Sequence, residues 1–153
     1  YSLGSFFVED KRAFAKFTYP NINNPGEFGV GNVVVLKPSE VTFKGKLVVL
    51  VNENTQSQAE FTAMAFRAGG DTAIIGSKTS GADGNIVSFA LPGLLRTTFS
   101  GLGVYYPDGG ETQRVGIIPD LEVKQTIEGV KEGRDELVEK AIEVIRTREA
   151  AIK

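Results

Sequence analysis

The sequence predicts an α/β domain built around one strand–helix–strand unit. Residues 47–51 are rich in β-branched side chains and do not alternate with polar ones, which is typical of a central strand buried on both faces. A helical stripe of apolar residues follows from Ala59 to Phe66, and residues 72–75 predict a second buried strand. Because such crossover connections are right-handed, the two strands are expected to pair in parallel.

The length and charge of the chain limit the kinds of protein it can be. With 153 residues we expect a single domain over 1–153 with one packed core. Lys and Arg number 17 against 19 Asp and Glu, so a net charge of −2 leaves no basic excess for nucleic acid. The longest aliphatic run, at 47–51, is far below the roughly 20 residues of a membrane span. We therefore expect neither a nucleic-acid partner nor a membrane-spanning segment.

Cysteine and histidine are both absent. The first absence excludes disulfides, thiolate catalysis and cysteine-ligated zinc. The second removes the commonest general base and the commonest metal ligand. Asp83, Asp108 and Asp120 do not have the spacing of a calcium loop, and Asp120 is expected to tie a turn to backbone amides. We expect no metal and no cofactor.

The elements before the central unit are short. Residues 12–18 alternate between apolar and polar side chains, which predicts a half-buried strand. Residues 21–31 are rich in Asn and Gly and read as a loop of turns. A short strand is expected over 33–36, before Pro38.

The elements after the central unit are short strands and one long helix. Strands are expected between 86 and 123, with breaks at Pro92-Gly93, at Gly101 and at the turn 107–110. Residues 127–153 predict one amphipathic helix, with Leu137, Ala141, Ile142 and Ile145 at helical spacing and mixed charge on its outer face. It is expected to pack through Leu137, Ala141 and Ile145.

The turn between the first buried strand and the helix carries the most informative residue, Ser57. The free N–H groups at the start of this helix could stabilise an oxyanion beside the Ser57 hydroxyl. Alternatively, Ser57 caps the helix and Glu60 completes a capping box. The helix itself is expected to end at Gly69-Gly70 with a left-handed glycine.

Three ordered segments resemble the carboxy-terminal processing (tail-specific) serine peptidases, over about half of the chain. They are Val48 to Glu60, Ile74 to Gly81, and Tyr106 to Gly109 together with Gly116 to Val123. The family motif Ser-Ala-Ser-Glu matches Ser57-Gln58-Ala59-Glu60, so the resemblance implies that Ser57 is the nucleophile and that the Gln58 backbone N–H helps to form the oxyanion hole. It also implies a crotonase/ClpP-like sheet with crossover helices.

The chain departs from this family at the general base. The family run Thr-Phe-Gly-Lys is Thr79-Ser80-Gly81-Ala82 here, so the base lysine is missing. Lys78 lies four positions before Ala82, so its side chain would have to approach Ser57 from a different place to act as the base. A serine hydroxyl is a weak nucleophile without a base. The tricorn core protease, a similar branch, lacks the lysine and takes its base from a histidine upstream of the nucleophile strand.

In that branch a Glu precedes the Gly-x-x-Pro-Asp segment, and the matching residue here is Gln113. A glutamine could orient a base but could not supply negative charge. An upstream Arg-Asn-x-Gly-Gly-like segment of the family is not found in the chain. We therefore expect residues 1–153 to be the C-terminal part of a catalytic domain, incomplete at its N-terminus, whose base lies in an upstream part of the same protein.

The resemblance implies a serine endopeptidase that acts on unfolded or C-terminal polypeptide in the periplasm or cell envelope. Thr79, Gly81 and Gly84 would shape the substrate-binding wall beside Ser57, or are simply loop residues. Two alternatives remain. Modules of interphotoreceptor retinoid-binding protein resemble this fold without proteolysis, so Ala82 also fits a non-catalytic module that binds peptide or a hydrophobic ligand. An acyl-coenzyme A enzyme of the crotonase-like group would not need the serine.

Overall fold

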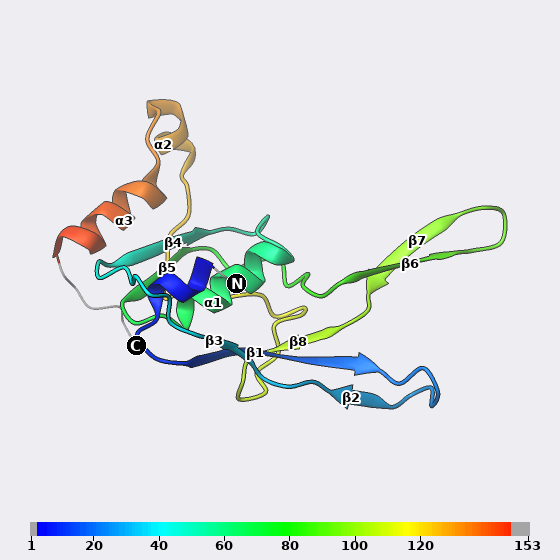
Figure 1. The fold of residues 1–153 in the computed structure, drawn as a ribbon. Helices are drawn as coiled ribbons and strands as arrows, with labels where there is room; N and C mark the ends of the chain where they lie inside the picture. The colour runs from blue at the N-terminus through cyan, green and yellow to red at the C-terminus, as the bar shows by residue number, and fades with distance from the viewer. Residues whose placement is uncertain (1–2, 148–153) are drawn as a thin grey trace.

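The computed structural model describes residues 3–147 and shows a mixed α/β fold (Figure 1). Its elements, in chain order, are the 3₁₀ turn η1 (Leu3–Phe7), β1 (Arg12–Pro20), β2 (Phe28–Val30), β3 (Val34–Leu36), β4 (Leu47–Val51), α1 (Gln58–Arg67), β5 (Thr72–Gly76), β6 (Ile86–Ala90), β7 (Arg96–Ser100), β8 (Gly103–Tyr105), β9 (Leu121–Glu122), α2 (Ile127–Glu132) and α3 (Glu136–Thr147).

A parallel sheet of order β4-β5-β9 forms the centre of the molecule. Leu47 lies opposite Thr72 and Val51 opposite Gly76, which confirms the predicted parallel pairing. All five residues of β5 are buried, because β4 and β9 flank it and α1 and α3 pack against its two faces. Among the described residues β4 is an edge strand and only partly buried, so the prediction that it is the central strand was wrong. The continuous apolar run does not distinguish an edge strand that is covered on its faces from a central one.

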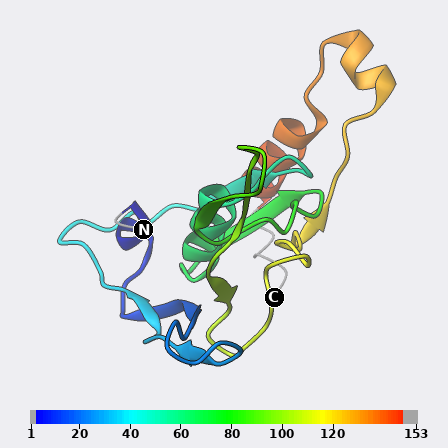
Figure 2. The same ribbon diagram turned by 90° about the vertical axis from the view of Figure 1, so that its right-hand side faces the viewer.

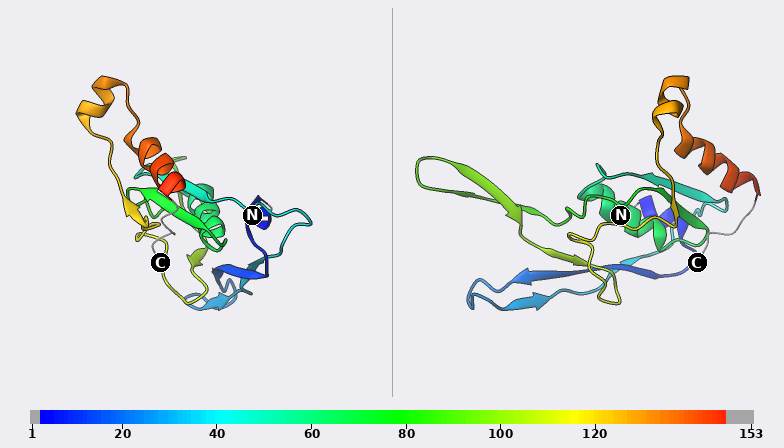
Figure 3. Two further views of the ribbon diagram at one scale, coloured as in Figure 1. Left: turned by 90° about the vertical axis from the view of Figure 1, so that its left-hand side faces the viewer. Right: turned by 180° about the vertical axis from the view of Figure 1, so that it is seen from behind.

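Helices α1 and α3 cover opposite faces of this sheet, as the left view of Figure 3 shows. On the α1 side, Met64 and Ile74 belong to a core that also includes Phe14 from β1. On the α3 side, Ala141 and Val144 pack against Ile75. The sheet is therefore buried on both sides, and the turn from β4 into α1 is anchored at both of its ends.

In a second, antiparallel sheet, β1 pairs with β2, β3 and β8. Thr18 lies opposite both Val30 of β2 and Gly103 of β8, so these two strands flank β1 on opposite edges. Strand β2 lies in the segment that the sequence predicts as a loop, because its three residues are surrounded by turn residues. Strands β6 and β7 form a hairpin that projects from the body (Figure 1). The predicted breaks near Pro92 and Gly101 are confirmed.

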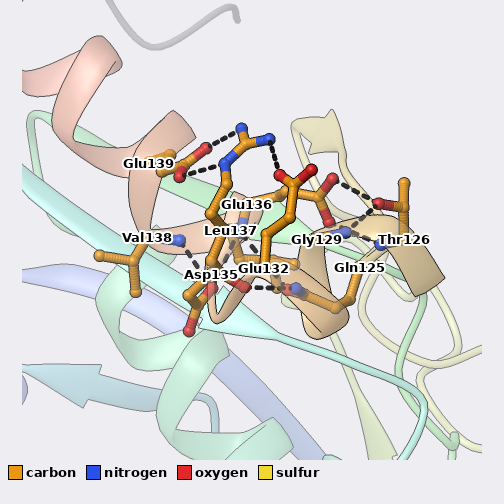
Figure 4. Close-up of polar contacts among 10 residues, drawn as sticks. Gln125, Thr126, Gly129, Glu132, Asp135, Glu136, Leu137, Val138 and Glu139 are labelled. Atoms are coloured by element: carbon orange, nitrogen blue, oxygen red, sulfur yellow. Dashed lines mark hydrogen bonds and ion pairs between the residues drawn. The ribbon is translucent and has the colours of Figure 1, made fainter.

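The C-terminal segment forms two helices, so the prediction of one continuous helix was wrong. Gly133 adopts a left-handed conformation with φ 70° and ends α2. The Asp135 carboxylate then accepts hydrogen bonds from the N–H groups of Leu137 and Val138 and starts α3 (Figure 4). Glu136 reaches back to Thr126, the N-cap of α2 (Figure 4). As a result α2 projects away from the sheet (Figures 1 and 2).

The packing of α3 also differs from the prediction. Ala141 is buried as expected and Leu137 is half-buried, but Ile142 and Ile145 are exposed, and Val144 is the second buried side chain. Leu137, Ala141 and Val144 are spaced i, i+4 and i+7 and so share one face of the helix, while Ile145 lies beside that face. The part of the predicted helix beyond residue 147 lies outside the described residues.

Two local details bear on the loops at the end of the sheet. Helix α1 ends at Arg67 with Ala68 in a right-handed conformation, so the expected left-handed glycine cap at Gly69 was wrong. Asp120 accepts a hydrogen bond from the Ile74 N–H and pairs with the Arg67 guanidinium, which confirms its predicted structural role.

Over residues 3–147, no helix is long and apolar enough to cross a membrane.

Candidate active site

Ser57 lies in the turn between β4 and α1, as the sequence predicts, and it has an unusual backbone conformation. It precedes α1 as its N-cap, with φ 53° and ψ −125°. A residue with a side chain in such a conformation costs about 1–3 kcal/mol and persists only where its surroundings hold it. The Ser57 N–H donates to the Ala82 carbonyl at 3.0 Å. The serine is thus held against the loop that follows β5.

Gln58 is the first residue of α1. The first N–H groups of a helix have no acceptor within it, and the helix dipole makes this end positive. The Gln58 side chain is occupied elsewhere, because its Nε2 donates to Thr62 Oγ1 at 3.3 Å. The geometry therefore leaves Gln58 the backbone role that the sequence suggests, an N–H group next to the Ser57 hydroxyl.

A cavity of about 690 Å³ lies beside Ser57. Its apolar walls come from β1, α1, β6 and β8, and its polar groups come from the start of α1 and from the loop before β6. The residues that line it are Phe17, Ser57, Gln58, Phe61, Asp83, Gly84, Asn85, Ile86 and Val104. The rings of Phe17 and Phe61 stack with centroids 5.6 Å apart. The space next to the serine is therefore bounded by aromatic and aliphatic side chains on one part of its wall and by polar groups on another.

The three predicted wall residues occupy two different places. Gly84 lines the cavity with Ser57. Thr79 and Gly81 are buried behind the wall, where both donate to the Glu60 carboxylate, at 2.5 and 2.8 Å. Gly81 has φ 68°, and a Cβ there would lie 2.9 Å from the Arg114 backbone, so only glycine fits without strain. Both residues shape the loop from behind.

Gln113 ties this loop to β8. Its Nε2 donates to the carbonyls of Asp83 and Leu102 at 2.8 and 2.7 Å, and its Oε1 accepts from the Val104 N–H at 3.3 Å. These hydrogen bonds all go to backbone groups. Gln113 therefore holds the cavity wall in place, whereas its role in orienting a base stays a prediction.

Asp83 is a buried carboxyl group in the wall of the cavity. The side chain is 5% exposed, its Oδ1 accepts from the Gly84 N–H at 2.7 Å, and its Oδ2 has no hydrogen-bond partner among the described residues. Burial raises the pKa of Asp83 above its ordinary 3.8, and the nearby Glu60 charge adds to this, while the Gly84 hydrogen bond opposes it. Ionising Asp83 therefore costs stability.

Because the folded pKa of Asp83 is raised, the folded protein keeps this proton at pH values where the unfolded chain has lost it. The contribution of Asp83 to stability is complete below pH 3.8 and is lost as the pH rises through the folded pKa. We expect Asp83→Asn to be more stable than wild type at pH 7, with the difference disappearing as the pH falls below 3.8. Urea unfolding against pH measures this, with exposed Asp10→Asn as the charge control. An Asp83→Asn variant less stable at pH 7 would contradict it.

Lys78, the other side chain considered as a base, lines a separate cleft. This cleft of about 650 Å³ lies at the carboxyl ends of the central strands and is bounded by Lys78, Ser77 and Glu122 among others. Within residues 3–147 there is also no group of three or more acidic side chains that could hold a metal ion.

Comparison with known proteins identifies the family. The model of peptidase family S41 matches residues 8–123, which include both sheets, α1 and the whole candidate site. The chain belongs to peptidase family S41. No curated protein gave a significant match. The resemblance found in the three sequence segments is thus confirmed at the level of the family, while the lysine-lacking branch stays a prediction.

Solved structures of S41 peptidases and similar proteins share this fold. A candidate peptidase from Parabacteroides merdae is 28% identical, with a TM-score of 0.85 over 94% of this chain and 45% of its own. Mature CPAF is 14% identical, with a TM-score of 0.78 over 99% of this chain and 42% of its own. The tricorn protease is 19% identical, with a TM-score of 0.60 over 90% of this chain and 12% of its own. The chain spans less than half the length of each of these structures.

Two residues of the candidate site were not assigned a role there from the sequence. Glu60 is expected as half of a capping box and as the last residue of the family motif, without a role in the site, and Asp83 only as a residue outside any metal motif. The spacing of a capping box is the sequence signal that could have found Glu60. The hydrogen bond from the Ser57 N–H to Glu60 Oε2 at 3.1 Å confirms the half of the capping box that Glu60 was expected to form. For Asp83 no local pattern exists, because its burial results from segments distant in sequence.

Proposed function

We propose that Ser57 is the nucleophile of a serine endopeptidase of the tail-specific type, which cleaves unfolded or C-terminal polypeptide. The observation that supports this most is the backbone of Ser57, a strained residue that stands at the positive end of α1 and lines a cavity. Strained conformations of this kind are concentrated at functional sites. Membership of family S41 gives the reaction class.

In this mechanism the Ser57 hydroxyl attacks the carbonyl carbon of the peptide bond. The hydroxyl proton passes to a base outside this chain, which returns it to the leaving amine. The Gln58 N–H donates to the oxyanion that forms on the carbonyl oxygen. Gly84 lies in the cavity wall, where its φ of 95° and its close approach to the Leu102 carbonyl require glycine, and Thr79 and Gly81 support that wall from behind. The base, the crotonase/ClpP-like architecture and a place in the cell envelope are parts of this proposal.

The preference for unfolded chains is tested by a comparison of two forms of one substrate. We expect the full-length protein to cleave a reduced, unfolded polypeptide and to leave the same polypeptide intact when its disulfides keep it folded. The reason is that the substrate chain around the scissile bond must be extended to bring that bond to Ser57, which lies beside a cavity with walls on several sides. Mass spectrometry of the products measures both rates. Equal cleavage of the folded form would contradict the preference.

A non-catalytic module that binds peptide or a hydrophobic ligand is the second candidate. Ala82 and the apolar walls from Phe17, Phe61 and Ile86 favour it. This candidate predicts that ligand binding is unchanged by removal of the Ser57 hydroxyl, whereas the peptidase loses its reaction.

A further inference from the structure

We propose that Glu60 is a positioning residue that fixes the backbone of Ser57 for attack, in addition to its place in the helix cap. The inference rests on the proposed role of Ser57 as nucleophile. Glu60 stands three residues after Ser57 in the first turn of α1 and has no exposed surface. Glutamate is almost never fully buried unless its carboxylate is paired.

Four donors surround the Glu60 carboxylate. Oε1 accepts from the Thr79 hydroxyl at 2.5 Å and from the Gly81 N–H at 2.8 Å. Oε2 accepts from the Ala82 N–H at 3.0 Å and from the Ser57 N–H at 3.1 Å. A carboxylate offers about four acceptor sites, so its capacity is filled. Hydrogen bonds to a charged acceptor are about twice as strong as neutral ones, and a filled buried network is rigid.

The same bonds close a small ring around the Ser57 backbone. The Ser57 N–H is shared between Glu60 Oε2 and the Ala82 carbonyl, and the Ala82 N–H returns to the same Oε2. A serine with φ 53° keeps that conformation only where its neighbours hold it. Glu60 is the one side chain in this ring, so it links the unusual conformation of Ser57 to the loop behind the cavity wall.

Thr79 extends the network to a third segment. Its Oγ1 accepts from the Ile117 N–H at 2.6 Å while its proton goes to Glu60, and its own N–H donates to the Ile117 carbonyl at 3.2 Å. The two segments pack closely here, because a Cβ on Gly116 would lie 2.4 Å from the Thr79 carbonyl oxygen. Helix α1, the loop after β5 and the segment before β9 are thus joined at one carboxylate.

This arrangement predicts a particular kinetic effect. Glu60 does not line the cavity beside Ser57, so its loss removes no direct contact with a bound substrate. It would move the nucleophile instead. A small misplacement of a reacting group can cost about 100-fold in rate. A residue that only caps the helix would change stability and leave the turnover of the folded enzyme as it was.

The test uses Glu60→Gln in the full-length protein with a peptide substrate. Whichever way the new amide is turned, its nitrogen faces at least one backbone N–H group in place of an acceptor. We expect kcat to fall by about 10- to 100-fold, with KM within about three-fold of wild type. Thr79→Val, which keeps the shape but loses the hydroxyl, should give a smaller loss of kcat, and Thr79→Ser should restore it.

Ile74→Val in β5 is the control, because it lowers core stability without a contact to this network. Its kcat should match wild type at a temperature well below its Tm. A folded Glu60→Gln variant with wild-type kcat would overturn the inference, as would equal kcat losses in Thr79→Val and Thr79→Ser. If Glu60→Gln does not fold, the Thr79 pair decides. Ser57→Ala distinguishes a failure of the Glu60 inference from a failure of the proposed function. Wild-type activity in Ser57→Ala would refute the role of Ser57 as the nucleophile, whatever the Glu60 variant does.

Discussion

Ser57→Ala should abolish peptidase activity of the full-length protein and leave its fold intact. The substitution removes the attacking oxygen, and removal of a nucleophile costs several orders of magnitude in rate, about 10⁶-fold in a well-studied serine peptidase. The stability should fall by no more than the loss of a helix cap, about 0.5–2 kcal/mol. Activity on a chromogenic peptide and thermal unfolding measure the two quantities in the same sample.

Ser57→Gly is the matched control for the backbone. It also removes the hydroxyl, but glycine tolerates φ 53° and ψ −125°, so the strain is relieved. This variant should be as inactive as Ser57→Ala and at least as stable. Full activity in Ser57→Ala would show that the serine is structural and that the strained turn serves the fold alone.

Residues 1–153 on their own should not react with a fluorophosphonate probe. The chain has no histidine, carries Ala82 where the family has its lysine, and turns Lys78 toward a different cleft. Ser57 should therefore keep the low reactivity of an ordinary alcohol even with its backbone in place. Intact-mass measurement after incubation with the probe should show the unmodified chain. Stoichiometric labelling would mean that a base within these residues is sufficient.

The sequence predicts the centre of the fold well, for local reasons. Each of the three central elements has a recognisable local pattern, namely the apolar run at 47–51, the helical stripe after it and the apolar segment at 72–75. The structure confirms β4, α1 and β5, and it confirms the parallel register of β4 with β5. The position of β4 at the edge was missed because sheet order depends on β9, which is two residues long and has no period of its own.

The C-terminal helix shows how a local breaker can be overlooked. A single glycine inside a helical pattern is often tolerated, so Gly133 alone does not predict a break. The structure pairs it with Asp135, which caps the next helix, and the two together make a firm break. The predicted face then shifted from Ile145 to Val144.

In the candidate site too, the features that depend on local sequence could be predicted, and the features that depend on distant contacts could not. Ser57 and the Gln58 N–H follow from a strand-to-helix turn that lies within a dozen residues. The network of Glu60 joins residues about 20 and more positions apart, and the unpartnered oxygen of Asp83 depends on the packing around it. Neither could be derived from spacing, because buried polar contacts of this range are set by the tertiary fold.

The most direct test of Ser57 as the nucleophile is the site of covalent modification in the full-length protein. After reaction with a fluorophosphonate probe, proteolytic digestion and mass spectrometry should find one adduct, on the peptide that contains Ser57, and no adduct in Ser57→Ala. An active protein that carries its adduct on another serine, or that hydrolyses peptides while Ser57 stays unmodified, would contradict the assignment.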